Sequence, residues 1–315
     1  MKKNLFLVCL FMFGTLASCQ CSSKKSADNA VVNTTETPVP LGDPFILLHD
    51  GVYYAYGTHS NKGIEFYTSD DLLTWKYGGL ALNKEDSWAD RWFWAPEIYF
   101  VNGKFYMYYS ADEHICVAVA DSPTGPFVQD KKEPMIADEK CIDNSLFIDD
   151  NGTPYLSFVR FNDGNNIWIA ELEKDLITIK KETMHPCLHV TQEWEKVWPR
   201  VNEGSYILKH NGIYYMSYSA NSYESPFYGV GCATGTWTKY DENPLLQKPG
   251  KLVGVGHSAM FTDKAGKLRI VYHAHKDKDN IHPRAMYIGE VSFENVGGVD
   301  RMRISEEYIT PKFVK

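Results

Sequence analysis

Short hairpin motifs recur five times along this chain of 315 residues and restrict its fold more than any other feature. The clearest copy turns at Asn211-Gly212, a dipeptide suited to a tight turn with positive φ. The other copies turn at a glycine before a short alternating strand, namely Gly51, Gly103, Gly152 and Gly266. The glycines are 49 to 60 residues apart. A repeat of that length in strand-rich sequence indicates a propeller blade or a comparable array unit. With five copies we expect an all-β fold, a five-bladed β-propeller in which each blade is a four-stranded antiparallel sheet.

Polar and aromatic residues recur at a nearly constant distance before these turns. Nine positions before Gly103, Gly152, Gly212 and Gly266 are Trp94, Asp143, Glu203 and His257, respectively. Eight positions before Gly51 is Asp43. Blades are arranged radially, so equivalent positions at the start of the innermost strands converge. We therefore expect an active site in the central channel of the propeller.

The N-terminal region has the layout of an export signal. Two lysines precede an apolar run that is too short for a membrane span, so residues 1–19 are predicted to be a signal peptide. The ending Leu16-Ala17-Ser18-Cys19 resembles a lipoprotein box, which implies a lipid anchor on Cys19 in the envelope of a Gram-negative bacterium. An ordinary signal peptide cut nearby is the alternative. Residues 20–40 read as a flexible tether and residues 41–315 as one catalytic domain.

The charge of the chain narrows its partners. The formal net charge is −8, and no basic cluster is interleaved with aromatic residues. Nucleic acid is therefore excluded as an expected partner, because phosphate binding needs a positive surface. We expect a monomer that contacts a membrane only through Cys19.

Each acidic residue of the repeat has a plain alternative interpretation. Asp43 precedes a proline and could only form a turn, Asp143 could bind its own backbone, and Glu203 could be solvated. Three independent turn formers have no reason to share one position of three repeats, so their common placement favours a functional cluster. Three carboxyl groups around a cleft suit glycoside hydrolysis with inversion, which needs one protonated carboxyl and one ionised carboxylate.

Other residues are expected to contact the substrate. Trp94 offers an apolar face for a sugar ring, while His257 and Arg284 offer polar contacts. A histidine that packs between blades and an arginine on the surface are the alternatives for the latter two. Glu97 is out of register, and we expect it to lie away from substrate. His273 and His275 alternate on a predicted strand, where two residues share a face without any metal.

Several of these segments, in order, resemble glycoside hydrolase family 43. They are Gly42-Asp43-Pro44, Trp94-Ala95-Pro96-Glu97, Ile142-Asp143, Glu203-Gly204 and Gly256-His257. The resemblance implies Asp43 as general base, Asp143 as the group that orients the acid and tunes its pKa, and Glu203 as general acid. It also implies a sugar contact for Arg284 and a channel calcium ion close to His257 in some relatives, with no cofactor required for catalysis. Ser205 and Glu97 depart from the residues usual in the family.

The sequence thus predicts an inverting exo-glycosidase that releases terminal α-L-arabinofuranose from plant polysaccharides. A β-xylosidase, a galactofuranosidase or galactosidase, and an endo-arabinanase remain alternatives of the same fold. A glycan-binding lipoprotein without catalysis is the alternative of another class. Amide substitutions at Asp43 or Glu203 are expected to abolish turnover and to leave thermal unfolding nearly unchanged.

Overall fold

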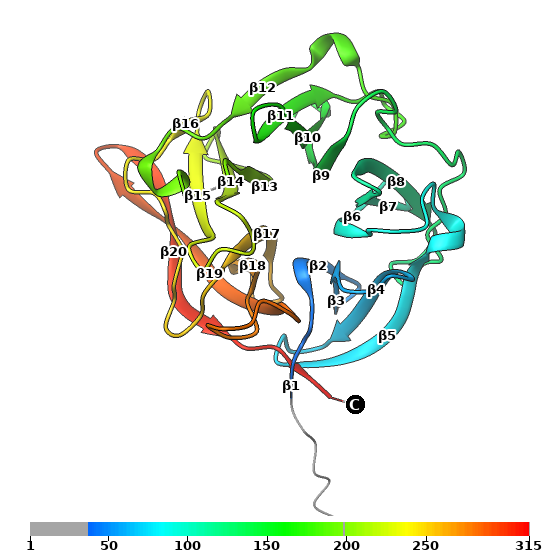
Figure 1. Cartoon of the computed structure of the whole chain (residues 1–315), viewed down its shortest axis with the longest axis horizontal. Helices are drawn as coiled ribbons and strands as arrows, with labels where there is room; N and C mark the ends of the chain where they lie inside the picture. Colours follow the sequence, from blue (N-terminus) through cyan, green and yellow to red (C-terminus); the bar gives the residue numbers. More distant parts are fainter. Residues whose placement is uncertain (1–36, 198, 315) are drawn as a thin grey trace, which may run out of the picture. The chain divides into compact units, whose positions relative to one another are not determined.

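The computed structural model describes residues 37–197 and 199–314. Their strands form five sheets around a central axis (Figure 1). The innermost strands are β2 (Gly42–His49), β6 (Trp94–Val101), β9 (Cys141–Ile148), β13 (Asn202–His210) and β17 (Gly256–Thr262). The predicted five-bladed β-propeller is confirmed. The predicted signal peptide, the lipid-anchor residue Cys19 and most of the predicted tether lie outside the described residues and stay predictions.

The first blade closes the ring by joining the two ends of the domain. Its sheet has six strands, in the order β1 (Thr37–Pro38), β21 (Lys312–Phe313), β5 (Thr74–Asn83), β4 (Gly63–Ser69), β3 (Val52–Thr58) and β2 (Gly42–His49). Val39 is fully buried, and its backbone N–H donates to the carbonyl of Pro311. Residues 37–40 therefore belong to the folded domain, although they were expected to belong to the tether.

The other blades differ in their number of strands. Blade two has only three, with its outer edge reduced to isolated bridges: β6 (Trp94–Val101), β7 (Lys104–Ala111) and β8 (His114–Ala120). Blades three to five have four strands each. Blade three consists of β9 (Cys141–Ile148), β10 (Pro154–Phe161), β11 (Asn165–Glu171) and β12 (His185–Leu188). Blade four consists of β13 (Asn202–His210), β14 (Ile213–Ala220), β15 (Gly229–Thr234) and β16 (Thr238–Lys239), and blade five of β17 (Gly256–Thr262), β18 (Leu268–Ala274), β19 (Ala285–Val296) and β20 (Val299–Ile309).

Helix is scarce, as the alternating sequence pattern indicates. The described residues form three short 3₁₀ helices, at Lys84–Asp86, Lys181–Thr183 and Glu193–Glu195. Within the described part of the chain, no helix has the length and apolar character needed to cross a membrane. The apolar faces of neighbouring blades pack on each other and bury large aromatic side chains such as Trp75 and Tyr109.

The five hairpin turns fall into two lengths. In blades one, two and four, two residues with positive φ connect the strands; Asn211 and Gly212, for example, have φ of 48° and 78°. In blades three and five the loop is one residue longer, because backbone hydrogen bonds join Asp149 to Thr153 and Asp263 to Lys267. In both types the last residue of the loop is a glycine with positive φ. In the longer loop this glycine lies one position further along the chain from the start of its blade.

Every innermost strand carries the same β-bulge near its start. Two residues on the first strand oppose one on the second, and the first residue of each bulge has positive φ between 45° and 58°: Asp43, Ala95, Asp143, Gly204 and His257. Trp94 and Glu203 lie one position earlier than the register predicted, because the turns of their blades are shorter. A bulge re-aims side chains at the end of a strand, and here it does so at one end of the channel.

Candidate active site

The three predicted carboxylates come together with His257 at the start of the innermost strands. Asp43 (β2), Asp143 (β9) and Glu203 (β13) are 8, 7 and 8% exposed. Nδ1 of His257 lies 3.4 Å from Oδ1 of Asp43 and 3.8 Å from Oδ2 of Asp143. Burial lowers the pKa of His257, with Asp43 opposing, so its imidazole is neutral near pH 7.

Hydrogen bonds between neighbouring blades hold the bulges in place. In four blades, the backbone N–H of the positive-φ residue donates to a polar side chain on the second strand of the preceding blade: Ala95 to Thr58 Oγ1 (3.0 Å), Asp143 to Ser110 Oγ (3.0 Å), His257 to Ser219 Oγ (2.7 Å) and Asp43 to His273 Nδ1 (3.1 Å). Such bonds offset the strain of a non-glycine residue at positive φ.

Blade four is the exception, and it serves Asp143. The equivalent second-strand residue of blade three is Val159, which has no polar atom to offer. The backbone N–H of Gly204 instead donates to the Asp143 carboxylate. Gly204 has φ of 55°, and a Cβ there would lie 3.0 Å from Cγ of His257. The Glu203-Gly204 pair is therefore explained by backbone conformation and by close packing on His257.

Asp43 is held in its ionised form. Nη1 and Nη2 of Arg284 donate to its two carboxylate oxygens at 2.6 and 2.9 Å, and Thr58 Oγ1 donates to Oδ2 at 2.6 Å. Burial alone would raise the pKa of Asp43, but Arg284, His257 and His273 outweigh it and hold that pKa well below its ordinary value.

Glu203 and Asp143 are shifted in the opposite direction. Burial raises the pKa of Glu203 to about 7, although the Tyr228 hydroxyl donates to Oε1 at 2.8 Å and Nδ2 of Asn165 donates to Oε2 at 2.9 Å. Burial, followed by the charges of Glu203 and Asp43, raises the pKa of Asp143 well above its ordinary value. The site thus combines one carboxyl whose pKa is lowered with two whose pKa values are raised, a pattern found where acid and base roles are divided.

The predicted substrate-binding residues lie in different settings. Arg284 is not a surface arginine: it is 8% exposed, pairs with Asp43 and has the Tyr223 ring 4.8 Å from its guanidinium carbon. Trp94 is partly buried and stacks on Trp92 with ring centroids 5.7 Å apart and planes 11° apart. Trp92, which lies two residues before the start of β6, was not predicted, although the spacing of the two tryptophans was available as a signal.

Four residues that contact the carboxylates were not predicted individually as site residues: Thr58, Asn165, Tyr228 and His273. His273 was interpreted only as part of an alternating strand. It is fully buried, and burial followed by the charge of Arg284 lowers its pKa to about 3, so its neutral ring can accept the Asp43 N–H. The Tyr228 ring stacks on His273 at 5.6 Å between centroids and so links the Glu203 side of the site to the Asp43 side. Only Thr58 and His273 carry a sequence signal, because both occupy the same second-strand position of their blades.

The residues around His257 do not fit the predicted calcium ion. Calcium takes six to eight oxygen ligands, whereas the Asp43 oxygens are already engaged by Arg284 and Thr58. Among the described residues, no group of three or more His, Cys, Asp or Glu side chains is arranged to hold a metal ion.

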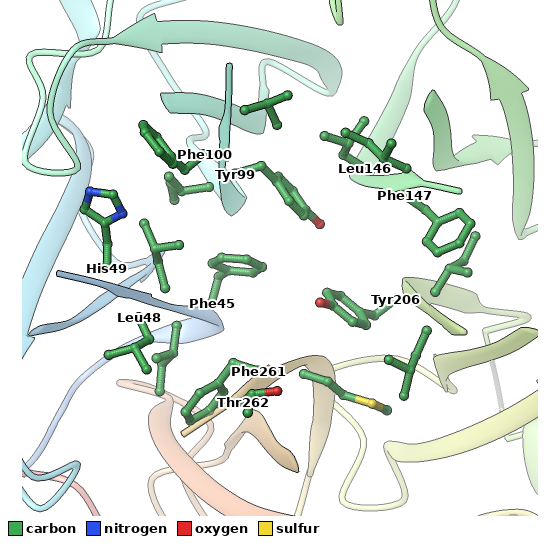
Figure 2. A pocket seen from close by; sticks show the side chains of 18 of the residues that line it. Phe45, Leu48, His49, Tyr99, Phe100, Leu146, Phe147, Tyr206, Phe261 and Thr262 are labelled. Atoms are coloured by element: carbon green, nitrogen blue, oxygen red, sulfur yellow. The ribbon is translucent and has the colours of Figure 1, made fainter. Parts of the chain in front are cut away.

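A second opening of the channel lies at the hairpin-turn end of the innermost strands. This cavity of about 670 Å³ is lined mainly by apolar side chains such as Phe45 and Phe261. Figure 2 shows the hydroxyls of Tyr99 and Tyr206 pointing toward its centre. The Tyr99 hydroxyl donates to Glu97, a carboxyl that is 7% exposed. No group of this cavity offers the paired carboxyls of the other end.

Glu97 provides a test of the electrostatics of the channel. Burial raises its pKa to about 8, although hydrogen bonds from Tyr99 and Ser145 oppose the shift. Because the unfolded chain ionises near pH 4.5, this carboxyl makes the fold less stable as the pH rises from about 4.5 to about 8. We therefore expect the difference in the free energy of unfolding between Glu97→Gln and wild type to shift in favour of the variant by about 2 to 4 kcal/mol when the pH is raised from 5 to 8.5. Denaturant unfolding at both pH values measures this shift, and Glu306→Gln, at an exposed position, is the control. A stability difference between Glu97→Gln and wild type that is the same at both pH values would contradict the raised pKa of Glu97.

Comparison with known proteins places this constellation in a family. The model of glycosyl hydrolases family 43 matches residues 35–296. The chain belongs to this family. Family-43 enzymes are inverting glycoside hydrolases that act on O-glycosyl bonds.

Individual family-43 relatives differ in the activity that their names carry. The solved structure of an endo-1,4-β-xylanase from Bacteroides thetaiotaomicron is 45% identical, has a TM-score of 0.86, and covers 90% of this chain and 100% of that chain. A β-D-galactofuranosidase of Aspergillus niger is 26% identical, with 84% of this chain and 83% of that protein covered. An extracellular exo-α-(1→5)-L-arabinofuranosidase of Cellvibrio japonicus is 25% identical, with 77% and 81% covered.

The Tyr228 hydroxyl is expected to set the upper limit of the pH profile. Its hydrogen bond favours the ionised form of Glu203, so Tyr228→Phe raises the pKa of that carboxyl further. We expect the alkaline limb of kcat/KM to move upward by about one pH unit. The buried Tyr215→Phe is a matched control, since its hydroxyl donates to the distant Asp300 carbonyl. An unchanged limb in Tyr228→Phe would show that Glu203 does not govern it.

Proposed function

We propose that this family-43 protein is an exo-acting glycosidase that hydrolyses terminal α-L-arabinofuranosyl linkages with inversion. In this proposal Glu203 is the general acid, Asp43 the general base, and Asp143 the neighbouring carboxyl that orients Glu203 and tunes its pKa. The observation that carries the assignment is the opposite pKa shift of the buried carboxyls: downward for Asp43, upward for Glu203 and Asp143. Inversion needs these two protonation states at the same pH.

The proposed mechanism follows from the contacts of each group. Asp43 removes a proton from a water molecule that attacks the anomeric carbon, while Glu203 donates a proton to the departing glycosidic oxygen. The donors from Tyr228 and Asn165 then stabilise the Glu203 carboxylate that forms. Arg284 keeps the Asp43 carboxylate oriented, and Trp94 provides the apolar face for a sugar ring.

The exo action and the furanose preference have separate support. All three carboxyls are 7 to 8% exposed, and such burial favours entry of a chain end over the middle of a polymer. The names of two relatives, a galactofuranosidase and an arabinofuranosidase, favour a five-membered ring. Action on β-1,4-linked xylose is the second candidate, because the 45% identical structure carries the name endo-1,4-β-xylanase.

A panel of 4-nitrophenyl glycosides, followed by linear arabinan and xylan, tests the proposal. We expect the highest kcat/KM on α-L-arabinofuranoside and release of free arabinose from chain ends. Highest activity on β-D-xyloside would favour the second candidate. Binding of glycans without turnover of any member of the panel would favour a non-catalytic glycan-binding protein.

A further inference from the structure

An aromatic cleft lies between blades three and four, at the end of the innermost strands opposite to the carboxylates. It has a volume of about 450 Å³ and is lined by the rings of Phe147, Tyr155, Tyr214 and Trp237. Phe147 lies at the turn end of β9, whereas Asp143 lies near the beginning of that strand. The length of a strand therefore separates the cleft from the active site.

Trp237 differs from its counterparts in the repeat. The residues with positive φ between the third and fourth strands of blades one and three are Leu72 (66°) and Leu176 (63°), and each is only 5% exposed. Trp237 takes the same conformation in blade four, with φ of 66°, but remains partly exposed in the wall of the cleft. A buried leucine satisfies the fold at this position, so the fold does not require the large indole.

The charged groups on the opposite wall of the cleft are engaged with one another. The Tyr214 hydroxyl donates to Oδ2 of Asp149 at 2.8 Å, and Nζ of Lys209 donates to Oδ1 at 2.7 Å while lying 4.7 Å from the Tyr214 ring centroid. Among the described residues that line the cleft there is no lysine or arginine. The cleft therefore suits a neutral ligand better than a phosphate or another anion.

Free polar groups accompany the aromatic faces. No described residue hydrogen-bonds to Nε1 of Trp237 or to the hydroxyl of Tyr155, and His185 uses only Nδ1, which lies 2.8 Å from the Thr183 carbonyl. Apolar ring faces with a few unsatisfied donors at their edges match a sugar, whose rings have C–H faces and hydroxyl edges.

We propose that this cleft is a second carbohydrate-binding site, which holds one or two neutral sugar units of a polysaccharide while another part of that polymer, or another chain, occupies the active site. The proposal rests on the chain acting on glycans, but it concerns binding at a place where no catalytic group lies. Two sites on one molecule raise the apparent affinity for a polymer and leave a small substrate unaffected.

Affinity electrophoresis of the full chain in native gels containing arabinan, arabinoxylan or xylan tests this site. Glu203→Gln is used as the background so that the polymer is not consumed. We expect at least one polymer to slow migration, and adding Trp237→Leu, which installs the residue of blades one and three, to weaken that affinity about tenfold. Tyr155→Phe should weaken it less. Tyr77→Leu, an exposed aromatic on blade one, is the matched control and should have no effect.

Hydrolysis by Trp237→Leu in the otherwise wild-type chain provides a second readout. Turnover of a 4-nitrophenyl glycoside should stay within twofold of wild type, while KM for the retarding polymer rises several-fold. Equal retardation with and without Trp237→Leu, or no retardation by any polymer, would overturn the second site. Absence of glycoside turnover in the wild type would defeat the proposed function instead, and the gel result would stand separately.

Discussion

Replacing Glu203 with glutamine is expected to lower kcat/KM on a 4-nitrophenyl glycoside by about a thousandfold. Glutamine keeps the shape of the side chain, and its amide oxygen can still accept from Asn165 while its NH2 group donates to the Tyr228 hydroxyl, but it is not an acid that can protonate the leaving group. The loss should depend on the leaving group, because a 2,4-dinitrophenolate departs without protonation. For that aglycone we expect a loss of less than about tenfold.

The pH dependence of the same variant supplies an independent check. The wild type should lose activity as the pH rises through about 7, where Glu203 gives up its proton. Glu203→Gln should show no such alkaline limb with the dinitrophenyl substrate. Equal losses for both aglycones, or an alkaline limb that persists, would assign the acid role to another residue.

Replacing Asp43 with asparagine should be more damaging to activity, with a loss of about ten thousandfold on both aglycones. The water still needs a base however easily the aglycone leaves, so the leaving group should make no difference. The low pKa of Asp43 also means that the wild-type base stays ionised well below neutral pH. Restoration of turnover by a better leaving group would contradict the base assignment.

Asp43→Asn is also expected to destabilise the fold, contrary to what the sequence alone suggested. Asp43 forms a buried bidentate pair with Arg284, and removing one partner of such a pair costs about 3 kcal/mol. The melting temperature should therefore fall by several degrees. Adding Arg284→Met should recover part of that loss without recovering activity. Kinetics measured well below the melting temperature keep the two effects apart.

Much of the site could be predicted because the repeat is visible in the sequence. The turn glycines placed Asp43, Asp143 and His257 at one structural position, and alternation of apolar residues identified the strands. The register of Glu203 and Trp94 was wrong by one residue because the length of a turn loop depends on its hydrogen bonds, which Gly152 and Gly212 alone do not reveal.

The remaining site residues depend on contacts between blades. Tyr228 and Asn165 reach Glu203 from segments that carry no repeat signal, and Arg284 comes from the connection between β18 and β19. Arginine was predicted to contact sugar, but its two hydrogen bonds to Asp43 make control of that carboxylate its clearest structural role. Such pairings arise only when distant segments fold together.

The stereochemistry of the first product tests the central claim most directly. Proton NMR of the wild-type reaction on an α-L-arabinofuranoside, recorded before mutarotation, reports the anomer that leaves the enzyme. Direct attack of an Asp43-activated water predicts β-L-arabinofuranose as the initial product, with the α-anomer appearing later in solution. Initial formation of the α-anomer would require a covalent intermediate and would contradict the roles given to Asp43 and Glu203.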